Sequence, residues 1–108
     1  GDSMPSKQAL SELLRTLRKQ RHEPLRVVAA AIEIDSTLLS KFERGQRFPS
    51  TAQLTRLAAY FGIPADELVA HAIADRIVSE YGQQTTMQQA LNILRERMSA
   101  YQAEGEVP

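Results

Sequence analysis

One stretch in the first half of the chain constrains the fold more than any other: LRVVAAAIEIDSTLLSKFERGQRFP, residues 25–49. It contains two short helical patterns separated by a tight turn, and Ala29 stands where the two helices must touch. Helices that cross steeply need a small residue at their contact, because a larger side chain would force them apart. The stretch therefore predicts two closely packed short helices with a polar, basic outer surface.

The rest of the chain also favours helix. Ala, Leu, Gln, Arg and Glu are plentiful, Gly and Pro occur only five times each in 108 residues, and no run of Val, Ile and Thr alternates with period two. Apolar spacing of three and four, with capping residues and Gly or Pro at the ends, predicts an all-α fold. The expected helices cover about residues 6–21, 25–32, 36–44, 51–61, 64–81 and 86–102.

Several classes of protein are excluded by what the sequence lacks. It has no cysteine, which rules out disulfides and thiolate zinc sites and fits a reducing cytosol. His22 and His71 are isolated, so we expect no metal site and no cofactor. No nucleophile elbow, glycine-rich phosphate loop or apolar run of membrane-spanning length occurs. We therefore expect a cytoplasmic protein that is not an enzyme and has no catalytic residues.

The charges are divided unevenly along the chain, although they sum to zero. Residues 1–50 hold nine Lys or Arg against six Asp or Glu, whereas residues 51–108 hold four against seven. This division suits a protein that places one face on phosphate and keeps the other away. The alternative is a chance division.

The helix expected at residues 36–44 has an inner and an outer side. Leu39 and Phe42 point inward, and Asp35 is placed to cap the first turn. Its outward side chains are short hydroxyls and long cations, which bond base edges and phosphates. They are Ser36, Thr37, Ser40, Lys41 and Arg44. The pattern predicts a surface for double-stranded DNA; the alternatives are that the first two hydroxyls only cap their helix and that the cations are ordinary solvated charges.

With these residues in place, the chain resembles the lambda-repressor-like, Xre-type helix-turn-helix proteins over about residues 7–70. The matching residues are Leu17-Arg18, Val28-Ala29, Ser40 to Gly45, Pro49-Ser50, Leu54, Leu57-Ala58 and Gly62-Ile63 through Leu68. The combination is specific, whereas one of these motifs alone would not be. A narrower resemblance is to small regulators found with restriction–modification systems.

The resemblance implies roles for individual residues. The base-reading positions of the family's recognition helix are held here by Ser36, Thr37 and Lys41. Ser40 lies close to them. The phosphate-gripping loop after that helix has Arg44, Gln46 and Arg47. Arg18 and Glu43 match a pair that braces the first helix against the third as a partly buried ion pair.

The chain departs from the family's pattern at three points. Glu33 stands in the turn between the second and third helices, where the family often has glycine, and would be strained if that turn needs a positive φ. His22 occupies a second common glycine position. Leu25 replaces a glutamine that binds phosphate, and the neighbouring Arg26 can take over that contact.

The expected last helix carries apolar residues in steps of four, three, four and three. This seam consists of Met87, Leu91, Leu94, Met98 and Tyr101. The seam can pair with a second copy of the chain, or fold back on the preceding helix of the same chain. We favour the dimer, because one recognition helix reads too few base pairs for specificity.

These observations predict a domain organisation and a function. We expect a disordered N-terminus with a cloning scar at residues 1–5, a five-helix DNA-binding domain at 6–70, and a helical dimerisation extension at 71–108 whose last residues, from 103, fray. The expected function is a sequence-specific bacterial transcription regulator on the nucleoid, a repressor or autoregulator acting as a homodimer. The alternative is a protein-interaction module, such as an antitoxin-like protein with an unknown partner, in which DNA binding is secondary.

Overall fold

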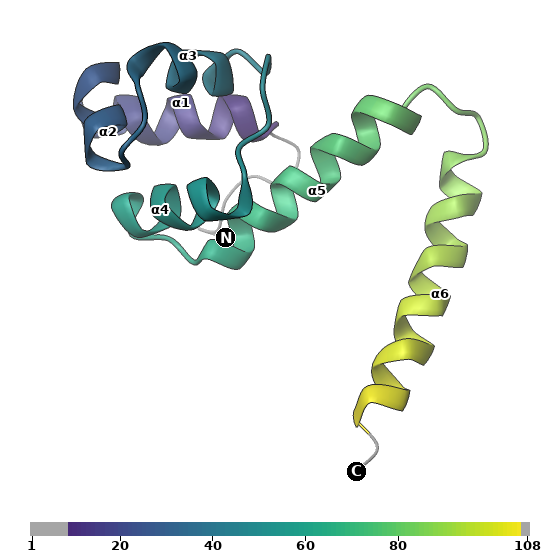
Figure 1. Cartoon of the computed structure of the whole chain (residues 1–108). Helices are drawn as coiled ribbons and strands as arrows, with labels where there is room; N and C mark the ends of the chain where they lie inside the picture. The colour runs from purple at the N-terminus through teal and green to yellow at the C-terminus, as the bar shows by residue number, and fades with distance from the viewer. Residues whose placement is uncertain (1–8, 107–108) are drawn as a thin grey trace. The chain divides into compact units, whose positions relative to one another are not determined.

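The computed structural model describes residues 9–106, which form six α-helices without a strand (Figure 1). The helices are α1 Leu10–Gln20, α2 Leu25–Ala31, α3 Ser36–Glu43, α4 Thr51–Phe61, α5 Ala65–Tyr81 and α6 Met87–Glu106. The all-α prediction is therefore confirmed for this part of the chain. The segment 1–5, which we expected to be disordered, lies outside the described residues.

The chain divides into two compact units, one up to Arg76 and the other from Ile77 onward. The first unit thus extends past residue 70, where the sequence suggested the end of the first domain. Ala72 belongs to its hydrophobic core, and Asp75 accepts a hydrogen bond from the start of α1. These contacts explain why most of α5 belongs with the first unit.

The core of the first unit receives buried side chains from all five of its helices. Its largest fully buried side chains are Leu14, Val28, Ile32, Leu39, Leu57 and Leu68. Burial of each such side chain stabilises the fold by about 1.5–3 kcal/mol. Helix α3 packs against both α1 and α2, and Ala29 is 1% exposed. Leu17 and Phe61 are only partly buried against it.

Four helices end in the same hydrogen-bonded turn. After α3, the N–H of Gly45 donates to the Phe42 carbonyl at 3.2 Å and that of Gln46 to the Lys41 carbonyl at 2.9 Å. The residue at the turn is left-handed, with φ of 73° at Gly45 and 71° at Gly62 after α4. Glycine adopts this conformation without steric cost, so it ends these helices as the sequence predicted.

Helices α1 and α2 use the same turn without glycine. The left-handed residue is His22 after α1, with φ of 55°, and Glu33 after α2, with φ of 64°. After Glu33, the N–H of the next residue, Ile34, donates to the carbonyl of Ala29 at 3.0 Å. A side chain in this region costs about 1–2 kcal/mol. Both departures from the family's glycines are therefore strained positions in this chain.

The starts of α1, α3 and α4 are capped by carboxylate or hydroxyl groups. Asp35 Oδ1 accepts from the N–H of Leu38 at 2.8 Å at the start of α3. Ser50 and Gln53 form a reciprocal capping box at the start of α4. Helix α1 has no cap of its own; instead Asp75 Oδ2, from α5, accepts from the N–H of Leu10 at 2.9 Å. This long-range cap orients α5 along the first unit.

Several helix boundaries differ from the predicted ones, most of them by one residue. Helix α1 starts at Leu10 and not near residue 6, because Ala9 is extended, with φ −65° and ψ 152°. Helix α3 ends one residue early, since Arg44 has left the helical conformation. Helix α6 continues to Glu106, so the fraying that we expected from residue 103 was wrong for residues 103–106.

The second unit consists of the last turn of α5, a short connection and α6. A Cβ at Gly82 would lie 2.6 Å from the Val78 carbonyl oxygen, so the connection needs glycine there. The unit encloses an apolar groove of about 420 Å³. Its apolar lining is Ile77, Tyr81, Met87, Ala90, Ile93 and Leu94.

Candidate nucleic-acid interface

A shallow groove lies between the start of α2 and the outer face of α3. It has a volume of about 500 Å³ and is lined by Pro24, Leu25, Arg26, Ser36, Thr37, Ser40 and Arg44. Five of the eight residues that the sequence analysis assigned to DNA binding therefore share one surface. Lys41 is half-buried on the same helix, α3, and Gln46 and Arg47 are exposed in the loop that follows it.

The hydroxyl groups at the start of α3 are not used as caps. Asp35 performs that function, as described above. Ser36 and Thr37 are exposed and have no hydrogen-bond partner among the described residues. Hydroxyls in this position can donate to and accept from a ligand in the groove. The alternative that they serve only to cap their own helix has no support in these contacts.

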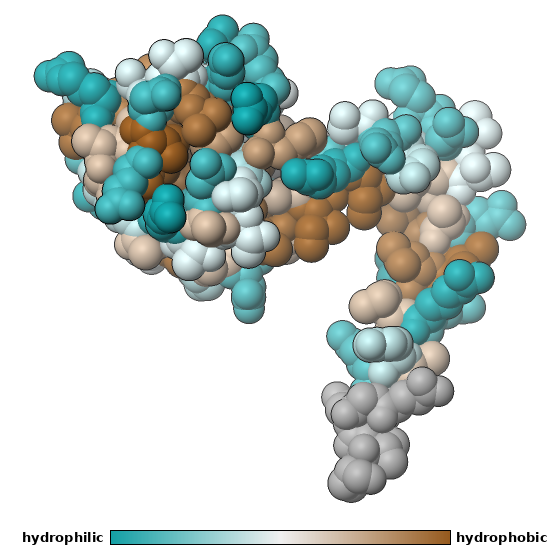
Figure 2. Space-filling view, in the orientation of Figure 1, coloured by the Kyte–Doolittle hydropathy of each residue, from teal (hydrophilic) through white to brown (hydrophobic). Residues whose placement is uncertain are grey.

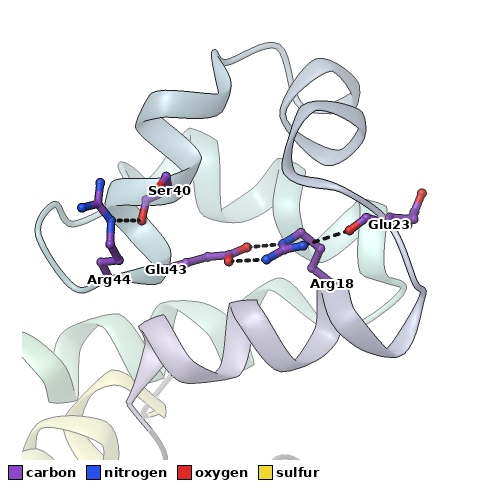
Figure 3. A network of polar contacts seen from close by, with 5 residues as sticks. All are labelled: Arg18, Glu23, Ser40, Glu43 and Arg44. Carbon is purple, nitrogen blue, oxygen red and sulfur yellow. Dashed lines mark hydrogen bonds and ion pairs between the residues drawn. The ribbon is translucent and has the colours of Figure 1, made fainter.

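The cations at the groove have few hydrogen-bond or ion-pair partners among the described residues. Arg44 Nε donates to the Ser40 carbonyl at 3.3 Å (Figure 3). This bond holds the guanidinium against the last turn of α3 and leaves its two terminal nitrogens free to donate. Within the described residues, Arg26, Lys41 and Arg47 form no hydrogen bond or ion pair. Guanidinium and ammonium groups without partners are suited to bind phosphate oxygens.

An ion pair braces α3 against α1. Arg18 Nε and Nη2 donate to the two carboxylate oxygens of Glu43 at 2.7 and 2.9 Å, and Arg18 Nη1 donates to the Glu23 carbonyl at 2.9 Å (Figure 3). The side chains are 13% and 6% exposed. The hydrogen bond to Glu43 raises the pKa of Arg18 above its ordinary value. One guanidinium thus joins α1, the end of α3 and the turn before α2, which places the two halves of the groove relative to each other.

A second polar cluster, which the sequence analysis missed, lies at the turn after α1. Glu23 accepts hydrogen bonds from the Tyr60 hydroxyl and from Arg21 Nε, and the Arg21 guanidinium lies 4.7 Å from the centre of the Tyr60 ring. The Tyr60 hydroxyl and then Arg21 lower the pKa of Glu23, and Glu23 raises the pKa of Tyr60. No local sequence pattern predicts this cluster, because Tyr60 belongs to α4 and is distant from Glu23 in the sequence.

The residues expected to form a dimer seam lie in the second unit. Leu94, Met98 and Tyr101 are exposed, by 46%, 48% and 71%, whereas Met87 and Leu91 are half-buried. Met87 and Leu94 line the apolar groove of that unit. Hydrophobic surface is therefore left open on the second unit, where Figure 2 draws brown residues between hydrophilic ones.

Two other features are absent from the described part of the chain. No group of three or more His, Cys, Asp or Glu side chains there is arranged to hold a metal ion. No helix within residues 9–106 is both long and apolar enough to cross a membrane.

Comparison with known proteins identifies the class. The family described as a helix-turn-helix domain matches residues 9–72, and the chain belongs to this family. The family predicted from the sequence is thus confirmed, while the narrower likeness to restriction–modification regulators stays a prediction. The relatives found in this family are transcriptional regulators and not enzymes.

Individual relatives are similar over different lengths. The HTH-type transcriptional regulator DdrOP3 of Deinococcus deserti is 38% identical over 76 residues, which are 70% of this chain and 54% of the relative. The chain thus spans about half the length of that protein. A crystal structure of the clp gene regulator ClgR from C. glutamicum is 25% identical, with a TM-score of 0.52 over 68% of this chain and 95% of that one.

A second ClgR structure, from Corynebacterium glutamicum, is similar over almost the whole chain. It is 20% identical, with a TM-score of 0.54 over 95% of this chain and 96% of that chain. At this identity the likeness concerns the fold alone. It includes helices beyond the matched domain, so the helical extension also has a counterpart among solved structures.

Proposed function

We propose that this chain is a transcription regulator that binds duplex DNA by inserting α3 into the major groove. The observation that carries the proposal is the groove between α2 and α3, where hydroxyls and cations converge and have few partners within the protein. An α-helix fits the major groove, where base edges offer a distinct set of donors and acceptors. Membership of the helix-turn-helix family supports this assignment.

The roles of the groove residues follow from their chemistry. Ser36 and Thr37, at the exposed start of α3, are proposed to meet base edges, together with Lys41. Arg26 on α2 and Arg44 just after α3 line the same groove and are proposed to bind phosphates. Ser40 lies in the same surface.

The loop after α3 extends the proposed phosphate contacts. Gln46 and Arg47 are exposed there and are proposed to grip the backbone. Phosphate contacts fix the position and register of a protein on DNA, whereas base contacts select the sequence. We therefore propose that the start of α3 selects the DNA sequence and that the residues around it supply the affinity.

We further propose that two copies of the chain act together, pairing through the exposed apolar residues of the second unit. Soluble monomers seldom leave a large apolar stripe uncovered. Two recognition helices reading half-sites about one DNA turn apart would supply the specificity that one lacks. The proposed outcome in the bacterial cytoplasm is repression or autoregulation by occupation of a promoter.

Binding to labelled duplex DNA over a series of salt concentrations tests the proposal. Phosphate contacts release counterions, so the affinity should fall steeply as salt rises. Lys41→Ala with Arg44→Ala should weaken binding by about tenfold or more without changing the melting temperature. The matched control is Arg15→Ala with Lys19→Ala, which removes two exposed cations from α1, a helix outside the groove. Equal losses in both double variants would contradict a specific role for α3.

One observation supports a second candidate function. Pro24 and Leu25 give the groove an apolar wall, and an apolar wall suits a protein segment better than a phosphate. Under this alternative the groove holds a partner protein and DNA binding is secondary. Duplex binding that is weak and insensitive to salt would favour the partner protein, and protection of DNA upstream of the chain's own gene would favour the regulator.

A further inference from the structure

The loop between α3 and α4, residues 44–50, is anchored at both ends but not in its middle. The turn at Gly45 fixes its start, and buried Pro49 with the capping box of Ser50 fixes its end. Arg47 and Phe48 form no hydrogen bond within the described residues. Among the described residues, no hydrogen bond therefore fixes the middle of this loop, which carries Arg47.

A contact from α5 supplies this restraint. The guanidinium carbon of Arg76 lies 4.7 Å from the centre of the Phe48 ring. Phe48 is 42% exposed, so the ring is not held by the hydrophobic core. A guanidinium over an aromatic face is attracted by the ring's negative face, even near water. Arg76 thus fixes the residue next to Arg47.

The position of Arg76 is itself fixed. The preceding residue, Asp75, accepts the hydrogen bond from the N–H of Leu10 at 2.9 Å, which ties this turn of α5 to the start of α1. Two consecutive residues of α5 therefore hold two segments that are distant in the sequence, α1 and the loop between α3 and α4. Neither contact serves the hydrophobic core directly.

We propose that Arg76 is a positioning residue for DNA binding: by stacking on Phe48 it holds the loop between α3 and α4 so that Arg47 meets the phosphate backbone. This inference rests on the proposed function. Ordering a loop before binding raises affinity, because the entropy of ordering is not lost during association. A single exposed cation–aromatic contact should account for about a two- to fivefold change in affinity.

A double-mutant cycle on DNA binding tests the proposal, using Arg76→Gln, Phe48→Leu and both together, measured on one labelled duplex over a salt series. Each single variant should weaken binding by about two- to fivefold, and the double variant by no more than either single one. Arg76→Lys should recover part of the loss, because an ammonium is also attracted to the ring.

The salt series separates positioning from direct contact. Arg47→Gln should reduce the slope of log affinity against log salt by about one phosphate, whereas Arg76→Gln and Phe48→Leu should leave that slope nearly unchanged. Arg95→Gln, an exposed cation of the second unit, is the matched control for lost charge.

Three results would overturn the inference. They are additive losses in the cycle, no loss in either single variant, or a slope of log affinity against log salt that Arg76→Gln reduces as much as Arg47→Gln does. The last would make Arg76 a phosphate ligand. Failure of the unaltered chain to bind duplex DNA would overturn the proposed function and this inference with it. Binding by the unaltered chain together with one of the three results above would overturn this inference alone.

Discussion

The carboxylate of Asp75 caps a helix that begins 65 residues earlier, since its Oδ2 accepts the N–H of Leu10 at 2.9 Å. Ala9, at the position where a cap normally stands, cannot provide one. The first turn of a helix has free N–H groups and a partial positive charge, and a carboxylate there satisfies both. The end of the first unit is thus joined to its beginning.

Loss of this cap should destabilise the first unit. We expect Asp75→Ala to lower the free energy of unfolding by about 1 kcal/mol, the usual loss when a helix cap is removed. Glu80→Ala is the control, since it removes an exposed carboxylate from the same helix, outside its first turn. Urea denaturation followed by circular dichroism measures both, and equal effects would contradict the capping role.

The ion pair between Arg18 and Glu43 should also be necessary for stability. Removal of either partner leaves a poorly hydrated charge, so we expect Arg18→Ala and Glu43→Ala each to lower the free energy of unfolding by about 2 kcal/mol. The double variant should lose less than the sum, by about 1 kcal/mol or more, because the pair is bidentate. Additive losses would show that the contact contributes nothing.

Glycine should relieve strain at two helix ends. We expect His22→Gly and Glu33→Gly each to raise the free energy of unfolding by about 1 kcal/mol, since glycine adopts a positive φ without steric cost. The control is Ala30→Gly, at an exposed site inside α2, which should lower it by about 1 kcal/mol. Thermal melting distinguishes the signs, and destabilisation by all three would contradict the argument.

The stabilisation that the Tyr60–Glu23 hydrogen bond supplies should depend on pH. Contacts with Tyr60 and Arg21 lower the pKa of Glu23 below its ordinary value of 4.5. A group whose pKa is lower in the folded state stabilises the fold above its ordinary pKa, and this contribution is lost as the pH falls through the lowered value. The difference in melting temperature between the wild type and Tyr60→Phe should therefore be full near neutral pH and shrink below pH 4.5. A constant difference over this range would contradict the linkage.

Local sequence patterns predicted most of the helices, because the residues that begin and end a helix lie next to it in the sequence. Helix α4 has the predicted bounds, since Ser50 begins it and Gly62 ends it. The small Ala29 and the apolar spacing predicted the core. The start of α1 was placed too early, near residue 6, although its apolar spacing begins only at Leu10, because the extended backbone at Ala9 is not encoded by that spacing.

Contacts between distant segments could not be predicted in this way. The Asp75 cap and the Arg76–Phe48 stack join residues that share no motif, and Tyr60 reaches Glu23 from another helix. Only Arg18 and Glu43 were paired in advance, through resemblance to a family. The groove residues Ser36, Thr37 and Ser40 were predictable because they follow the outward positions of α3, whereas Arg26 of α2 was assigned through the resemblance.

We expect dimerisation to depend on the second unit. Its exposed apolar side chains include Val78, Tyr81, Ile93, Leu94 and Met98. A single helix pair has little capacity to bury such residues, and isolated helices are only marginally stable in water. We therefore expect the full chain to be a dimer at micromolar concentration, as measured by light scattering.

Substitution on one face of α6 tests this expectation directly. Leu94→Lys with Met98→Lys should give a monomer with weaker DNA binding, because charges would be placed where apolar surfaces meet. Gln88→Lys with Gln89→Lys adds the same charge to exposed positions of the same helix and should leave the dimer intact. Truncation after Arg76 should likewise give a folded monomer, since it retains Ala72, Asp75 and the whole core of the first unit. A truncated chain that still dimerises would move the interface into the first unit, and a full-length monomer would leave α6 without a partner from a second copy.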